Sequence, residues 1–107
     1  MSITDKIEEL QNILKADSAN FSVRRQLAVL LLDNGFAEDA LPHFLYLSQI
    51  FQQDSTIWYN LGIVYEKLKN YPKAEDAYLK AIEFSPEEVD ATYNLGLVYI
   101  ETKEYNK

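Results

Sequence analysis

The stretch YNLGIVY occupies residues 59–65, and YNLGLVY occupies residues 93–99. The two differ only where Ile63 is replaced by Leu97, and the second begins 34 positions after the first. A fixed period between about 20 and 50 residues is typical of stacked helical or strand units that share one core. This period divides the chain of 107 residues into an N-terminal segment 1–20, a divergent first unit 21–54, a second unit 55–88 and a third unit 89–107 that stops short.

The second unit shows which residues recur. It carries an ordered set of apolar, small and aromatic residues, namely Trp58, Leu61, Gly62, Tyr65, Ala74, Tyr78, Ala81 and Pro86. The third unit keeps Leu95, Gly96 and Tyr99, and the first keeps Leu27, Ala40 and Phe44. This set resembles the tetratricopeptide repeat, with its W-x2-L-G-x2-Y, A-x3-F and P positions in a unit of the same period. The resemblance implies an all-α, helix-turn-helix solenoid, wound as a right-handed superhelix, of about two and a half repeats plus an N-terminal helix.

Residues 3–16 have the pattern of one amphipathic helix. The apolar side chains recur at helical spacing and form one stripe, made of Ile3, Ile7, Leu10, Ile13 and Leu14. Leu10 stands 34 positions before Phe44, so the segment takes the place of the second helix of a preceding unit. Terminal repeats are often atypical. We therefore expect this helix to cap the stack.

Local signals predict where helices end and begin. Gly35 in the sequence DNGF is expected to close a helix in the left-handed conformation. Pro72 suits the first turn of a helix, where its missing N–H has no helical partner. In the sequence SPEE, Ser85 is expected to cap a helix with Pro86 at its first position and Glu88 completing a capping box.

Two small residues indicate where helices approach closely. Gly62 and Ala74 fall on the facing sides of two antiparallel helices predicted within the second unit. A larger residue at either place would push the backbones apart, so the helix penalty of glycine, about 1 kcal/mol, is tolerated there.

The composition argues against several classes of function. There is no Cys and only one His, His43, with no nucleophile, metal-ligand or glycine-rich phosphate motif around it, which predicts a non-enzymatic protein without cofactor or metal. The net charge of −7 would repel nucleic acid. The longest apolar run, Leu27–Leu32, is too short for a membrane span and no signal peptide is visible, so we expect a cytoplasmic protein.

The repeat resemblance also implies where partners bind. In this family the first helix of each pair lines a concave groove, and the groove positions recur with the period of the repeat. They comprise an amide row (Gln26, Asn60, Asn94), an apolar row (Val29, Ile63, Leu97) and a flanking row (Arg25, Tyr59, Tyr93). Amides both donate and accept hydrogen bonds, so the row suits the backbone of an extended peptide. The alternative is that Asn60 and Asn94 serve only local capping or solvation.

These patterns favour a protein-interaction scaffold that holds a peptide or a partner helix in the groove. Another interpretation is a self-association or spacer segment of a longer repeat array, with a homodimer formed through the shortened C-terminal end. A third is an accessory segment of a multidomain enzyme. The carboxylate pairs Glu8–Glu9 and Glu87–Glu88 are neighbours in sequence and point to different helix faces, so neither is expected to form a catalytic or metal-binding pair.

Overall fold

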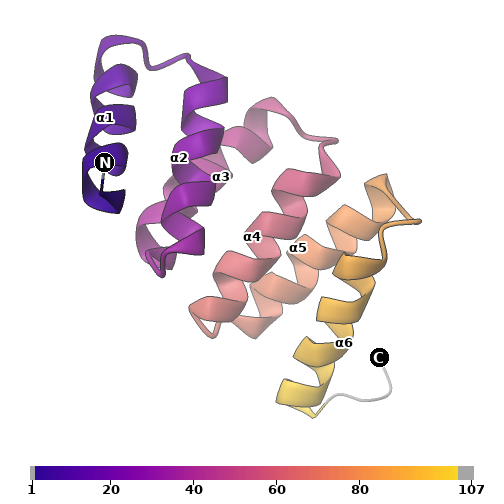
Figure 1. The fold of residues 1–107 in the computed structure, drawn as a ribbon. Coiled ribbons are helices and arrows are strands. Elements are labelled where there is room, and N and C mark those ends of the chain that lie inside the picture. Colours follow the sequence, from indigo (N-terminus) through magenta and orange to yellow (C-terminus); the bar gives the residue numbers. More distant parts are fainter. Residues whose placement is uncertain (1, 104–107) are drawn as a thin grey trace.

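The computed structural model describes residues 2–103, which form an elongated stack of six α-helices without a strand in that range (Figure 1). In chain order they are α1 (Ile3–Ala16), α2 (Phe21–Asp33), α3 (Ala37–Ile50), α4 (Ser55–Lys67), α5 (Tyr71–Phe84) and α6 (Val89–Thr102). Each helix packs against the next, and the molecule measures 48 by 25 by 19 Å. The predicted all-α helical solenoid is therefore confirmed. We call α2, α4 and α6 the first helices, and α3 and α5 the second helices.

The first helices begin at capping residues that recur every 34 positions. Asn20 accepts a hydrogen bond from the Val23 N–H at 3.1 Å, and Asp54 accepts one from the Thr56 N–H at 3.0 Å. Each bond satisfies one of the backbone donors that a helix start leaves unpaired. The helices therefore start in the same register in each unit.

The third first helix corrects the prediction made from SPEE. Its cap is Glu88, whose carboxylate accepts from the Asp90 N–H at 3.2 Å, whereas Ser85 is the residue that ends α5. Pro86 and Glu87 form a turn between the two helices, closed by a bond from the Glu88 N–H to the Ser85 carbonyl at 3.0 Å. The prediction was wrong because a Ser–Pro pair suits a turn as well as a helix start.

The first helices also end alike, at a residue with positive φ. Gly35 has φ of 87°, and the equivalent residues of the next two units, Lys69 and Lys103, both have φ of 61°. After α2 the Phe36 N–H reaches back to the Leu31 carbonyl at 2.8 Å, which satisfies an otherwise unpaired carbonyl. Gly35 thus has the left-handed conformation that was predicted. Lysine in that conformation costs on the order of 1 kcal/mol more than glycine.

Helix α1 is only partly buried in the stack. Leu10 and Leu14 are buried against the core, but Ile3 and Ile13 remain 46% and 37% exposed. Only part of the apolar stripe predicted for this helix is therefore buried. A single neighbouring helix can cover only a narrow strip of α1, which explains the difference.

Gly62 lies where the second unit is most tightly packed. It is buried, and a methyl group added to it would overlap the ring of Tyr78 on α5. The predicted close approach is confirmed, although the group that fills the space is the Tyr78 ring. Gly96, the equivalent residue of α6, is exposed and has nothing within 4 Å of the place of a Cβ.

The two glycines provide a matched test of this packing. We expect Gly62→Ala to lower the free energy of unfolding by about 1–3 kcal/mol, because the ring must shift. Gly96→Ala should instead raise it by up to about 1 kcal/mol through better helix propensity. Urea unfolding followed by circular dichroism would measure both. Equal effects from the two substitutions would contradict the packing described for Gly62.

Candidate functional site

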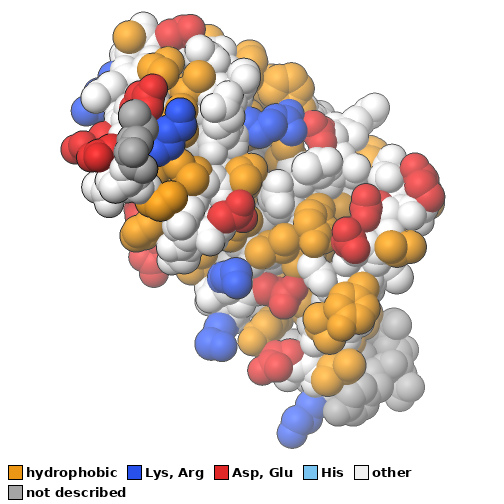
Figure 2. All heavy atoms as spheres, viewed as in Figure 1, with side chains coloured by type: hydrophobic (Ala, Val, Ile, Leu, Met, Phe, Trp, Pro, Cys, Tyr) orange, Lys and Arg blue, Asp and Glu red, His pale blue; other side chains and the backbone are white. Residues whose placement is uncertain are grey.

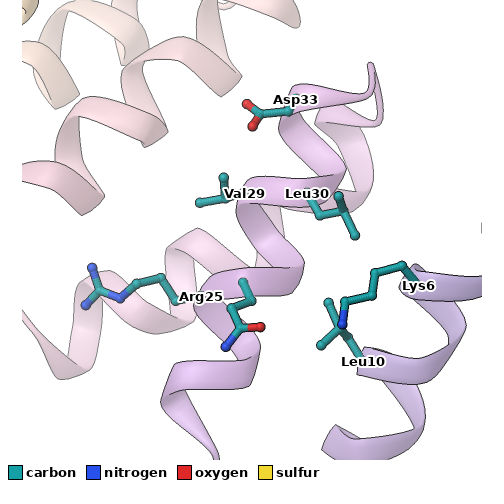
Figure 3. Close-up of a pocket in the computed structure, with 7 residues that line it drawn as sticks. Lys6, Leu10, Arg25, Val29, Leu30 and Asp33 are labelled. Atoms are coloured by element: carbon teal, nitrogen blue, oxygen red, sulfur yellow. The ribbon is translucent and has the colours of Figure 1, made fainter. Parts of the chain in front are cut away.

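The first helices present a continuous face on which apolar side chains alternate with scattered charges (Figure 2). Two hollows open along it. The larger, which we call the α1–α2 hollow, has a volume of about 430 Å³ and is lined by Lys6, Leu10, Arg25, Gln26, Val29, Leu30 and Asp33. Figure 3 shows α1 contributing Lys6 and Leu10 on one side, with Arg25, Val29, Leu30 and Asp33 coming from α2. Three groove residues predicted from the sequence thus lie around one cavity.

The second hollow, which we call the α4–α6 hollow, has a volume of about 310 Å³. Its lining is more polar and consists of Ile63, Glu66, Lys67, Lys69 and Asn94. Ile63 and Asn94 are predicted groove residues on two successive first helices. The structure therefore brings members of two predicted rows together here.

Arg25 has a structural partner. Its guanidinium donates to the Asp54 carboxylate at 3.0 Å and lies 5.6 Å from the centre of the Phe51 ring. Asp54 is the residue that caps α4, so this ion pair connects the middle of α2 to the start of α4. The side chain of Arg25 is still 38% exposed. It can therefore hold the helices together and border the α1–α2 hollow at the same time.

The three amides of the predicted row differ in their surroundings. Gln26 is exposed and reaches only Ser22, at 3.5 Å. Asn60 is partly exposed, and its side chain makes no hydrogen bond to any residue between 2 and 103. The Asn94 amide nitrogen, in contrast, donates to the hydroxyls of Tyr59 and Tyr78 at 3.3 and 3.4 Å. The three amides therefore differ in their hydrogen-bond partners and are not equivalent.

Tyr78 is the centre of a polar cluster beneath this face. Its ring is fully buried, and its hydroxyl donates to the Glu66 carboxylate and accepts from Asn94. Burial raises the pKa of the Tyr78 hydroxyl far above its ordinary range, and the bond to Glu66 raises that pKa further. The hydroxyl therefore remains a neutral donor, and it links α5 to Glu66 of α4 and Asn94 of α6, which both line the α4–α6 hollow.

An apolar strip runs along α6 on the side away from the core. It consists of Val89, Tyr93, Leu97 and Ile100, which are 73%, 68%, 41% and 58% exposed. These positions fall on one side of a helix, together with the open Gly96. Two predicted groove residues, Tyr93 and Leu97, lie in this strip and line neither hollow.

The sequence interpretation missed Lys6 and Leu10. The sequence predicts a capping helix at residues 3–16, whereas the predicted groove positions lie on the first helices. A signal was present, however. Lys6 stands 34 positions before Ala40 and 68 before Ala74. The first and second units thus have a small residue at the position where α1 has a lysine. A lysine there cannot be enclosed in the same way, because burying its charge would be costly.

His43 lies on α3, partly buried between charged neighbours. Its Nδ1 is 3.1 Å from the Arg24 guanidinium, which is a donor, so this nitrogen accepts and the ring is neutral. Burial lowers the pKa of His43, and the charge of Arg24 lowers it further, although Asp39 acts in the opposite direction. Arg24 also stacks on the Tyr46 ring at 4.3 Å. These contacts give His43 a packing role.

Within residues 2–103, no group of three or more His, Asp or Glu side chains is placed to hold a metal ion. In the same part of the chain, no helix combines the length and the apolar character needed to cross a bilayer.

Comparison with known sequences identifies the repeat. Two tetratricopeptide-repeat profiles match the chain, one at residues 55–88 and the other at residues 77–107. Together with the helix pairs and the regular spacing of their caps, these matches show that the chain is a tetratricopeptide-repeat protein. Its family and fold support a protein-interaction scaffold as the class of function. A search of curated proteins found no match.

Solved structures share the same fold. MamA (residues 41 to the end) from Desulfovibrio magneticus RS-1 superposes with a TM-score of 0.93 at 21% identity, over 96% of this chain and 58% of that one. A crystal structure of MamA gives a TM-score of 0.88 at 28% identity, over 94% of this chain and 58% of that one. A complex of Naa15 and Naa10 bound to HypK gives 0.72 at 24% identity, over 92% of this chain and 15% of that one. The present chain thus spans less than two thirds of the MamA chains.

The polar cluster around Tyr78 can be tested by removing a single oxygen. We expect Tyr78→Phe to lower the free energy of unfolding by about 1–3 kcal/mol, because Glu66 loses a donor and Asn94 loses an acceptor. Tyr93→Phe, at a hydroxyl on a 68% exposed side chain, should change it by less than about 0.5 kcal/mol. Urea unfolding measures both variants. A Tyr78→Phe protein as stable as the Tyr93→Phe protein would show that the cluster contributes nothing.

Proposed function

We propose that the chain is a non-enzymatic scaffold that binds a peptide or a partner helix along the face of α2, α4 and α6. The observation that carries this proposal is the position of the two hollows. Both open on the face that bears the predicted groove residues, and each is lined by members of those rows. Ligand sites in proteins are usually such concave places, with apolar walls and a few placed polar groups.

In this proposal, different parts of the face contact different parts of the ligand. The α1–α2 hollow has Leu10, Val29 and Leu30 among its walls, so it would take apolar side chains. The amide of Asn60, which has no partner in residues 2–103, would contact the ligand backbone. In this proposal Asn94 acts mainly through the fold, because its nitrogen is held by Tyr59 and Tyr78.

The groove can be tested with substitutions on the face of the first helices, with circular dichroism to verify that each variant is folded. We expect Val29→Asp to weaken partner binding at least tenfold, because a carboxylate would be desolvated against apolar ligand groups. Asn60→Ala should weaken binding by a smaller factor, about threefold to tenfold, through the loss of one hydrogen bond. Quantitative affinity capture with the intact protein would identify partners, and calorimetry with a purified partner would measure the loss.

Ile50→Asp provides the matched control for Val29→Asp. Ile50 is an apolar residue, 46% exposed at the end of α3, and it lines neither hollow. This variant should bind like the original protein. If partners bind all three variants equally well, the face of the first helices is not the binding site.

The exposed strip of α6 favours a second candidate, which is self-association. Val89, Tyr93, Leu97 and Ile100 form an apolar surface on one side of a helix, and such surfaces on soluble proteins often mark contacts with other chains. Two copies could cover the strip with an isologous contact between their α6 helices.

Sedimentation equilibrium tests this candidate. We expect the apparent mass to rise above 12.4 kDa with increasing concentration, and the double variant Tyr93→Asp with Ile100→Asp to remain at that mass. Leu79→Asp, at a 47% exposed residue of α5, controls for the introduction of a carboxylate on an apolar position. A wild-type chain that remains monomeric at every concentration would rule out the contact.

A further inference from the structure

A third hollow lies between the two second helices, with α4 at its floor. Its volume is about 220 Å³, and it is lined by residues of α3, α4 and α5 that belong to neither hollow of the first-helix face. In Figure 1, α3 lies behind α2 and α5 lies behind α4, so two of the three helices that line this hollow belong to the layer behind the first helices. We call it the α3–α5 hollow.

The walls of the α3–α5 hollow are mostly apolar. Leu45 of α3 is 39% exposed on one side, Leu61 lies at the base, and Ala77 of α5 stands opposite. Trp58 is held in place by a hydrogen bond from its Nε1 to the Gln52 carbonyl at 2.8 Å. A space of this size with a fixed aromatic wall suits one aliphatic side chain.

Two lysines border this apolar space. Lys73 lies 5.8 Å from the centre of the Tyr65 ring, and Lys80 lies 5.8 Å from that of the Trp58 ring. Both are exposed, and neither forms an ion pair with a carboxylate within residues 2–103. Asp76 is the one carboxylate in the lining. The border therefore carries a local excess of positive charge on a protein whose net charge is −7.

The spacing of the two lysines determines what can bind to both. They are seven positions apart on α5, which places them about 10 Å apart along the helix axis. An extended chain covers about 10 to 13 Å in three to four residues, and its residues i, i+2 and i+4 point to the same side. Two carboxylates at that spacing, with an apolar side chain between them, would match the two ammonium groups and the hollow between them.

We propose that the α3–α5 hollow is a second binding surface, which accepts an acidic segment of a protein partner with one aliphatic side chain in the hollow and carboxylates at Lys73 and Lys80. Charge complementarity provides most of the selectivity, since the rest of this acidic protein repels such a segment. The surface is separate from the groove. The scaffold thus has two faces that prefer ligands of different chemistry.

The only Trp of the chain lines the hollow and provides the measurement. The probe is an acetylated and amidated peptide, Gly-Ser-Glu-Ser-Leu-Ser-Glu-Gly, titrated into the full chain while Trp58 fluorescence is recorded. We expect a saturable change that weakens with added salt. The double variant Lys73→Gln with Lys80→Gln should lose at least tenfold in affinity, and so should a peptide in which Leu is replaced by Ser.

Lys67→Gln with Lys69→Gln is the matched control, because it removes the same charge from lysines at the α4–α6 hollow. This variant should bind the peptide as the original chain does, and so should Val29→Asp, which separates this site from the proposed groove. Circular dichroism verifies that every variant is folded. The proposal is overturned if Trp58 does not respond to millimolar peptide, if both lysine pairs matter equally, or if the peptide lacking Leu binds as well.

Discussion

The stack depends on an aromatic ring of a second helix packing against a very small residue of the preceding first helix. Tyr78 of α5 fills the space that a side chain on Gly62 of α4 would need. One unit earlier, Phe44 and Ala28 hold the same positions and are both fully buried. This contact sets the separation of the two helices, and the apolar residues around it pack accordingly. At Gly96 no described atom lies within 4 Å of the place of a Cβ, and Gly96 is exposed.

Tyr78 also links the core to the proposed binding face. Its ring is part of the core, while its hydroxyl bonds to Glu66 and Asn94, two residues that line the α4–α6 hollow. A residue of the repeat pattern thus orients an amide on the proposed binding face. Similarly, Arg25 borders a hollow and also forms an ion pair with the residue that caps α4. The predicted groove residues Arg25 and Asn94 thus also make contacts that hold the helices together.

The fold was largely predictable because the period of the repeat is visible in the letters themselves. Leucine, small and aromatic residues at this fixed spacing can be buried only when helices pack in pairs and the pairs stack. The architecture therefore follows from the pattern. The helix boundary at SPEE was less predictable, because the local capping rules favour Ser85, whereas the structure uses Glu88 as the cap. The choice between them depends on where α5 ends, which is decided by how far its apolar side packs on α4.

The sequence by itself determined the repeat, the order of the helices, the buried rows and the positions that share one face of the first helices. Only the tertiary structure decided which of these positions line a hollow, which are held by internal hydrogen bonds, and that Lys6, Lys73 and Lys80 border apolar cavities. The physical reason is that periodicity specifies the direction of a side chain from its own helix. A cavity, in contrast, depends on the shapes of side chains on two or three helices, and no single segment of the sequence contains that information.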